Sequence, residues 1–212
     1  MQQLLLDIRP RARPSLDRYI VGRNHELLAH LTAMLDGRAA EHSVYLWGDA
    51  GSGKSYLLDA FAAAAAERGM RVGSVGQTDA TVVVADQAEA WDEAMQVAAF
   101  AAFNAVRERG GMWLAAGRAP PAELPLLADL QSRLGWGLVF RVHNLSDAEK
   151  RAALTEHAAR LGFALEPHVA DYLFNHLARD MGTLMQTLDA LDRLSLQTRR
   201  PITLPLIRQL ID

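Results

Sequence analysis

A phosphate-binding loop is indicated by eight consecutive residues, Gly48-Asp49-Ala50-Gly51-Ser52-Gly53-Lys54-Ser55. Glycines in such a loop let the backbone approach phosphates closely, and the amide groups of the loop and of the following helix face the anion. In this pattern Lys54 neutralises the β and γ phosphates, and Ser55 holds Mg²⁺. The sequence therefore predicts a site for ATP or ADP with Mg²⁺, formed by residues 48–55 and by Tyr56, which begins the next helix.

The loop lies between a predicted strand and a predicted helix, which is the setting that phosphate binding requires. Val44 to Trp47 is an apolar run and is typical of a buried strand. Tyr56 to Arg68 has the pattern of a helix that stops at Gly69. A purely structural glycine turn is the competing interpretation, and the flanking strand and helix disfavour it.

A second strand is predicted for the β-branched run Thr81 to Ala85, and Asp86 stands at its carboxyl end. In this position Asp86 is expected to orient Mg²⁺ through a water molecule, and capping a helix is a compatible structural role. The next residue is Gln87, whose amide cannot accept a proton from water. Hydrolysis of the chain's own nucleotide is therefore expected to be slow unless Glu89 supplies the missing acid.

The rest of residues 16–145 alternates between helix and strand patterns. Helices are expected at 91–109 and within 126–134, and strands are expected at 112–117 and 138–142. This alternation predicts an α/β domain whose parallel sheet binds ligands at the carboxyl ends of its strands. Because few residues separate Arg68 from Asp86, we expect a strand or a helix to be missing from the core and the sheet to be reduced.

From Ser146 onward the pattern contains helices alone, which predicts a small helical lid domain over residues 146–212. Ser146 and Glu149 form a capping box for a helix that stops at Gly162. Further helices are expected after Pro167, over 180–197 and after Thr203.

The composition limits the function. The 212 residues carry a net charge of −3, so no global field draws the chain onto DNA. The sequence has no cysteine, which excludes disulfides and thiolate chemistry and fits a cytoplasmic location. No stretch approaches the length of a membrane span, so no membrane association is expected.

Residues 1–15 combine an apolar hexapeptide with a linker that contains arginine and proline. The hexapeptide is Gln3-Leu4-Leu5-Leu6-Asp7-Ile8. A secretory signal is excluded because Asp7 and Arg9 interrupt the apolar run. The residues alone leave two interpretations, which are a strand or helix docked on the fold and a peptide that binds a pocket of another protein.

The order of these features resembles the AAA+ class of P-loop NTPases, in which an α/β nucleotide-binding domain precedes a helical lid. More narrowly, the chain resembles the DnaA/Hda family over essentially its whole length. Leu16 to Leu28 resembles the family's adenine-binding segment, which implies that Ile20 and Val21 lie near the base. No helix-turn-helix domain follows the lid, and the N-terminus is short, so the shorter branch of the family is expected rather than the initiator.

Three arginines take their interpretation from this resemblance. The stretch from Leu124 to Lys150 is similar to Box VII of the family and implies that Arg133 is an arginine finger that acts in trans. Residues 176–193 resemble the sensor-2 segment, which implies that Arg179 reaches the nucleotide. Arg118 departs from the family because a polar or acidic sensor-1 residue is expected there.

The resemblance also implies partners. A Q-L-x-L-x-L peptide of the family docks on the DNA polymerase sliding clamp, the β subunit, which implies clamp binding by Gln3, Leu4, Leu6 and Ile8. Asp7 replaces the proline that is common in such peptides. DNA would be contacted only through the clamp, and a homodimer through the N-terminal peptide or the AAA+ faces is left open.

The function implied is a negative regulator of replication initiation that is docked on the DNA-loaded clamp and promotes hydrolysis of ATP bound to the initiator DnaA. Its own ATPase would be weak. The competing hypothesis is an active helicase-loader-like or DnaA-like AAA+ ATPase that acts on nucleic acid. A small-molecule P-loop kinase is disfavoured because the C-terminal helices do not resemble a mobile, arginine-rich lid.

Overall fold

The computed structural model describes residues 14–77, 79–177, 181–199, 201–203 and 205–207. The chain forms two compact units that divide between His143 and Asn144. The first unit contains a parallel sheet with helices, and the second unit is helical.

Five strands in the described part of the first unit form one sheet in the order β2-β3-β4-β1-β5, and all neighbours are parallel. The strands are β1 (Ser43–Trp47), β2 (Val72–Gly73), β3 (Val82–Ala85), β4 (Met112–Gly117) and β5 (Leu138–Arg141). Trp47 is in register with Gly117 on one side and with Arg141 on the other. The carboxyl ends of these strands therefore meet at one edge of the sheet, as the alternating sequence pattern predicts.

Between Arg68 and Asp86 we expect a strand or a helix to be missing; the strand is present as β2, and only the helix is missing from the described residues. β2 is only two residues long and pairs with Val82 and Val83. A helix between β2 and β3, where a crossover helix is usual, does not occur in the described residues of this segment. A short loop replaces it, and the backbone of Thr81 closes the loop by donating to the carbonyl oxygen of Arg71 over 2.8 Å.

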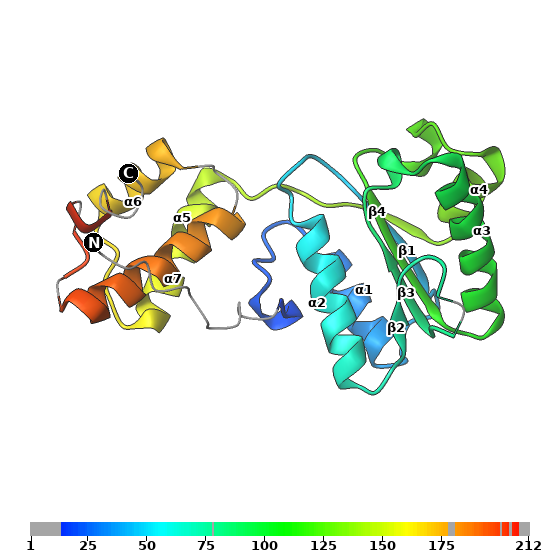
Figure 1. The fold of residues 1–212 in the computed structure, drawn as a ribbon, viewed down its shortest axis with the longest axis horizontal. Coiled ribbons are helices and arrows are strands. Elements are labelled where there is room, and N and C mark those ends of the chain that lie inside the picture. The colour runs from blue at the N-terminus through cyan, green and yellow to red at the C-terminus, as the bar shows by residue number, and fades with distance from the viewer. Residues whose placement is uncertain (1–13, 78, 178–180, 200, 204, 208–212) are drawn as a thin grey trace, which may run out of the picture. The chain divides into compact units, whose positions relative to one another are not determined.

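Helices cover both faces of the sheet (Figure 1). One face carries α1 (His25–Leu35) and α2 (Lys54–Glu67), and the other carries α3 (Glu93–Glu108) and α4 (Ala128–Leu134). Side chains of β1 alternate between the faces, so Val44 and Leu46 pack with the first pair of helices and Tyr45 packs with the second pair. The core is thus divided into two apolar layers, one on each side of the sheet.

Helix α1 has no counterpart among the elements expected from the sequence. Its buried side chains are Leu27, Leu31, Met34 and Leu35, which recur at helical spacing. They pack against the layer that contains α2. This spacing is the signal that could have predicted the helix.

The second unit contains α5 (Asp147–Leu161), α6 (Pro167–His176) and α7 (Met181–Thr198). The predicted capping box is confirmed, because the Ser146 side chain accepts from the Glu149 amide and the Glu149 carboxylate accepts from the Ser146 amide. Gly162 ends α5 with a left-handed φ of 93°. The helices enclose a separate apolar core that includes Leu154, Leu173 and Leu188.

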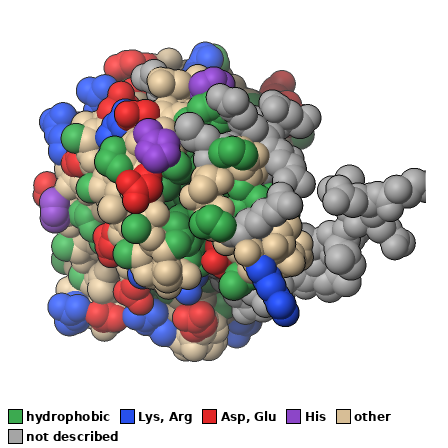
Figure 2. Space-filling view, turned by 90° about the vertical axis from the view of Figure 1, so that its left-hand side faces the viewer, with side chains coloured by type: hydrophobic (Ala, Val, Ile, Leu, Met, Phe, Trp, Pro, Cys, Tyr) green, Lys and Arg blue, Asp and Glu red, His purple; other side chains and the backbone are tan. Residues whose placement is uncertain are grey.

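None of the described helices is both long and apolar enough to cross a membrane. Figure 2 shows acidic and basic side chains interspersed over the face that it presents. The described side chains of that face therefore form no continuous basic strip of the kind that binds nucleic acid without sequence preference.

Candidate functional site

The phosphate-binding loop joins the end of β1 to the start of α2 at the carboxyl edge of the sheet. Gly53 precedes α2 with a left-handed φ of 96°, which glycine adopts without steric cost. A Cβ at Gly48 would lie 2.6 Å from the carbonyl oxygen of Val142, so a side chain there would collide with the backbone that follows β5. These two glycines fix the path of the loop and leave residues 49–51 exposed.

Lys54 is the first residue of α2, and its ammonium group turns back over the loop. The Nζ atom donates to the carbonyl oxygens of Gly48 at 2.8 Å and Asp49 at 2.9 Å, and Ser52 Oγ lies at 3.5 Å. The Lys54 side chain is half-buried. A cation is therefore held where the loop amides and the N-terminus of α2 gather, an arrangement that suits a polyphosphate anion.

Ser55 and Asp86 are brought together although they are far apart in the sequence. Ser55 Oγ donates to Asp86 Oδ2 over 2.5 Å, and Asp86 Oδ1 accepts from the amide of Gln87 over 2.7 Å. A hydroxyl and a carboxylate are oxygen ligands of the kind that Mg²⁺ prefers, together with water and substrate phosphates. The donor set at this edge of the sheet therefore fits the predicted Mg²⁺-nucleotide site.

The segment before α1 reaches the phosphate-binding loop through aromatic contacts. Tyr19 stacks with Tyr56 of α2, with ring centroids 6.1 Å apart. Ile20 and Val21 follow in a half-buried turn, and Val21 accepts from the amide of Asn24 over 2.8 Å. The two residues assigned to adenine therefore lie in a segment that contacts the first turn of α2.

Asn24 joins this segment by hydrogen bonds to the backbone that follows β5, a role that the sequence did not reveal. Its side chain is 3% exposed, donates to His143 O and to Tyr19 Oη, and accepts from His143 N. Burial raises the pKa of Tyr19 to about 12, although the hydrogen bond from Asn24 acts in the opposite direction. The phenol therefore stays neutral at physiological pH.

Replacing Asn24 with alanine is expected to lower the free energy of unfolding of the first unit by about 2 to 3 kcal/mol, because the backbone groups of His143 lose their partner. Urea unfolding followed by tryptophan fluorescence measures this unit, since all four tryptophans lie before residue 144. The matched control is Asp59→Ala, on an exposed position of α2 in the same unit, with an expected change below about 0.5 kcal/mol. Equal midpoints for the two variants would contradict the prediction.

A carboxylate lies at the end of β4 although the residue there is Arg118. Glu89 Oε2 accepts from the amide of Arg118 over 3.1 Å. A Cβ at Gly117 would lie 3.2 Å from the same oxygen and 2.1 Å from Tyr45 Oη, so Gly117 leaves room for both side chains. Residues of β1, β4 and the turn after β3 therefore converge here.

Arg133 lies in the last turn of α4 and packs its guanidinium on aromatic rings. Its Cζ atom is 3.8 Å from the ring centroid of Trp136 and 5.5 Å from that of Phe100, and Arg107 lies 4.6 Å from the Trp136 ring. Trp136 is 55% exposed. In the part of the chain that the structure describes, Arg133 forms no ion pair with a carboxylate.

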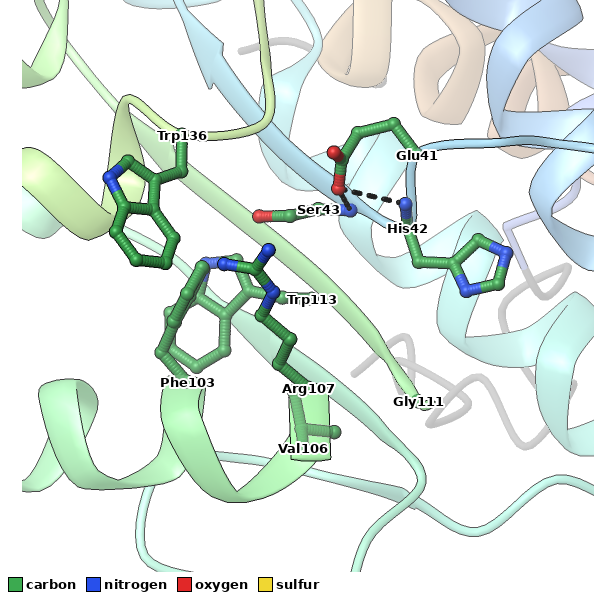
Figure 3. A pocket seen from close by; sticks show the side chains of 9 residues that line it. All are labelled: Glu41, His42, Ser43, Phe103, Val106, Arg107, Gly111, Trp113 and Trp136. Atoms are coloured by element: carbon green, nitrogen blue, oxygen red, sulfur yellow. Dashed lines mark hydrogen bonds between the residues drawn. The ribbon is translucent and has the colours of Figure 1, made fainter. Parts of the chain in front are cut away.

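A small cavity opens beside Trp136 (Figure 3). Its volume is about 40 Å³, and its lining residues are Glu41, His42, Ser43, Phe103, Val106, Arg107, Gly111, Trp113 and Trp136. Ser43 begins β1 and Gly111 precedes β4, so the cavity lies at the opposite end of these strands from the loop. The buried Nε1 of Trp113 has no partner among the described residues. The space is far smaller than typical ligand pockets, so it is not the nucleotide site.

Five of the predicted site residues lie outside the described residues. They are Gln3, Leu4, Leu6, Ile8 and Arg179. Their assignments stay predictions from the sequence.

Comparisons with known proteins agree with this architecture. Residues 147–211 match the family model described as "Hda, lid domain". The AMPPCP-bound DnaA from Aquifex aeolicus is 19% identical with a TM-score of 0.71, and the match covers 86% of this chain and 65% of that one. Domain III of Thermotoga maritima DnaA is 14% identical over 93% of this chain and 95% of its own, with a TM-score of 0.74.

A third solved structure extends the likeness beyond DnaA. The RuvB Holliday junction branch migration motor of Thermotoga maritima is 16% identical, covers 92% of this chain and 70% of its own, and has a TM-score of 0.64. The parallel sheet, the loop after β1 and the helical second unit thus give this chain the fold of the AAA+ proteins. The fold is the one seen in DnaA, and the part that matches the Hda lid model is the second, helical unit.

Proposed function

We propose that this chain is a nucleotide-bound regulator that promotes hydrolysis of ATP on the replication initiator DnaA. The observation that carries the proposal is the match of residues 147–211 to the Hda lid, joined to a DnaA-like AAA+ unit. Hydrolysis would leave the initiator inactive, so that origins do not fire again. The chain would act in the cytoplasm as a negative regulator of replication initiation.

The chain's own nucleotide is ADP or ATP with Mg²⁺. Support comes from the Lys54 ammonium group over the loop and from the 2.5 Å contact between Ser55 and Asp86. Ile20 and Val21 would lie near the adenine, and Arg179 would contact the nucleotide from the lid. The main effect of the bound nucleotide would be to stabilise the folded chain, and its hydrolysis would be secondary. The stabilisation would grow with the logarithm of the ratio of nucleotide concentration to Kd.

Arg133 is the group that would act on the initiator's ATP. Its half-buried side chain places the guanidinium on the rings of Trp136 and Phe100, unpaired with any carboxylate of the described residues. A positioned guanidinium that stabilises the transition state of phosphoryl transfer accelerates hydrolysis by about 10³ to 10⁵. The side chain would have to leave the Trp136 ring to reach a phosphate on a neighbouring molecule.

The N-terminal hexapeptide would hold the chain on the sliding clamp. Gln3 would form hydrogen bonds while Leu4, Leu6 and Ile8 fill an apolar groove, as short peptides do when they fold on a partner. DNA would then be contacted only through the clamp. Contacts between two copies of the chain, through the N-terminal peptide or the AAA+ faces, are a further association that the proposal allows.

Clamp binding tests the proposal directly. Purified clamp is expected to bind the full chain with a Kd near about 1 μM, and a Gln3→Ala/Leu6→Ala double variant is expected to lose at least about tenfold in affinity. The matched control is Gln2→Ala/Leu5→Ala, which changes the same residue types outside the motif positions. Stimulation of DnaA ATPase should require clamp loaded on DNA and should fall in the first variant alone.

Two results would count against this function. Equal clamp affinities for the two double variants would contradict the proposal that the N-terminal hexapeptide binds the clamp. Rapid ATP turnover by the chain on DNA, without DnaA or clamp, would favour the helicase-loader-like ATPase instead.

A further inference from the structure

The backbone after β3 turns sharply and places Glu89 over the end of β4. Gln87 has a left-handed φ of 54°, which is uncommon for a residue other than glycine and costs conformational energy. A short 3₁₀ turn, η2 (Ala88–Ala90), follows, and Ala88 in it is fully buried. This turn directs the backbone so that the third residue after Asp86, rather than the first, carries the carboxylate toward the sheet edge.

The Glu89 carboxylate is anchored at the junction of β1 and β4. It accepts from the Arg118 amide over 3.1 Å, and Gly117 beside it is in register with Trp47, the residue that precedes the phosphate-binding loop. The strained turn, the missing side chain at Gly117 and the hydrogen bond together keep the Glu89 carboxylate at the end of β4, next to the strand that leads into the loop.

Asp86 and Glu89 share an electrostatic environment. Burial raises the pKa of Tyr45 well above its usual range, and the nearby carboxylates of Glu89 and Asp86 raise it further. Tyr45 therefore stays a neutral phenol, whose hydroxyl donates to Ala119 O. Two carboxylates thus lie near one point of the sheet edge, and one of them is already engaged with Ser55.

We propose that the Glu89 carboxylate is the general base that activates water for slow hydrolysis of ATP at this chain's own site. The proposal rests on nucleotide binding at the loop as proposed above. In the step, the water oxygen bonds to the γ-phosphorus while the bond from that phosphorus to the oxygen bridging to the β-phosphate breaks. The Glu89 carboxylate accepts the proton of the water and later releases it to solvent, and the products are ADP and phosphate.

The test compares ATP hydrolysis by the full chain in wild-type and Glu89→Gln forms, without clamp or DnaA. Glutamine can still accept from the Arg118 amide, so the turn is kept while the base is removed. The turnover number is expected to fall by about 10²-fold, while the Kd for a fluorescent ADP analogue stays within about twofold. The Lys54→Ala variant gives the background rate of ATP hydrolysis. The matched control is Glu93→Gln on the exposed first turn of α3, and this variant should hydrolyse ATP like wild type.

The outcomes separate this proposal from the proposed function. Wild-type turnover in Glu89→Gln with normal ADP binding would overturn the assignment to Glu89 alone. The assignment to Glu89 would also be overturned if the wild-type chain binds ADP normally but hydrolyses no more ATP than Lys54→Ala. Absence of ADP binding in wild type would instead overturn the nucleotide site itself and the inference with it.

Discussion

An Arg133→Ala variant is expected to bind the clamp like wild type and to lose nearly all stimulation of ATP hydrolysis on DnaA. The stimulated rate should fall by about 10³-fold or to the unstimulated rate, whichever is reached first, because no other group replaces a guanidinium at the γ-phosphate. The measurement is release of phosphate from ATP-bound DnaA in the presence of DNA-loaded clamp. Arg133→Lys should restore little, since an ammonium group lacks the planar, forked donors of arginine.

The contact with Trp136 does not prevent this role. A cation-π contact at an exposed ring contributes about 0.5 to 1 kcal/mol. A 10³-fold acceleration corresponds to about 4 kcal/mol of transition-state stabilisation. Moving Arg133 from the ring to a phosphate is therefore favourable on balance.

Arg107→Ala is the matched control for Arg133→Ala, because Arg107 stacks on the same Trp136 ring from α3. If general positive charge near Trp136 were sufficient, the two variants would lose similar amounts of stimulation. An Arg133→Ala variant that stimulates DnaA as well as wild type would exclude the finger. Clamp affinity measured on the same samples shows whether any loss arises before the catalytic step.

Local patterns predicted the elements that carry the loop. The apolar run before Gly48 and the β-branched run before Asp86 form β1 and β3, which lie on either side of β4 in one parallel sheet, where strands are buried on both faces. The lid was predictable for a similar reason, since the capping box at Ser146 and the stop at Gly162 are encoded within a few residues. Patterns of this kind need no knowledge of distant contacts.

Features that depend on distant contacts were not predictable. β2 has two residues, too few for a periodic signal, and it exists only because β3 offers an edge to pair with. Asn24 bonds to His143 across 119 positions, and nothing in the sequence around either residue indicates that contact. The stacking of Arg133 on Trp136 and Phe100 likewise joins α4 to α3, which the two segments do not reveal separately.

Lys54→Ala is expected to weaken ADP and ATP binding by about 10²-fold, because charge-assisted hydrogen bonds to phosphate are each worth about 1.5 to 3 kcal/mol. The fold itself should survive, since alanine favours the first turn of α2 and the lysine is only half-buried. Affinity is read from the shift in unfolding free energy that ADP with Mg²⁺ produces. The chain has one other lysine, so Lys150→Ala is the matched control.

The expected gains in unfolding free energy on adding ADP distinguish a loss of nucleotide binding from a loss of folding stability. At an ADP concentration of about 100 times the wild-type Kd, ligand should stabilise wild type and Lys150→Ala by about 2.7 kcal/mol. A 10²-fold weaker Kd reduces this gain to about 0.4 kcal/mol in Lys54→Ala at the same concentration. Because Lys54 Nζ already bonds to the Gly48 and Asp49 carbonyls, the variant without ligand also reports what those bonds contribute to the loop. A full ADP-dependent gain in Lys54→Ala would show that the ammonium group does not hold the phosphates, and the nucleotide site would have to lie elsewhere in the chain.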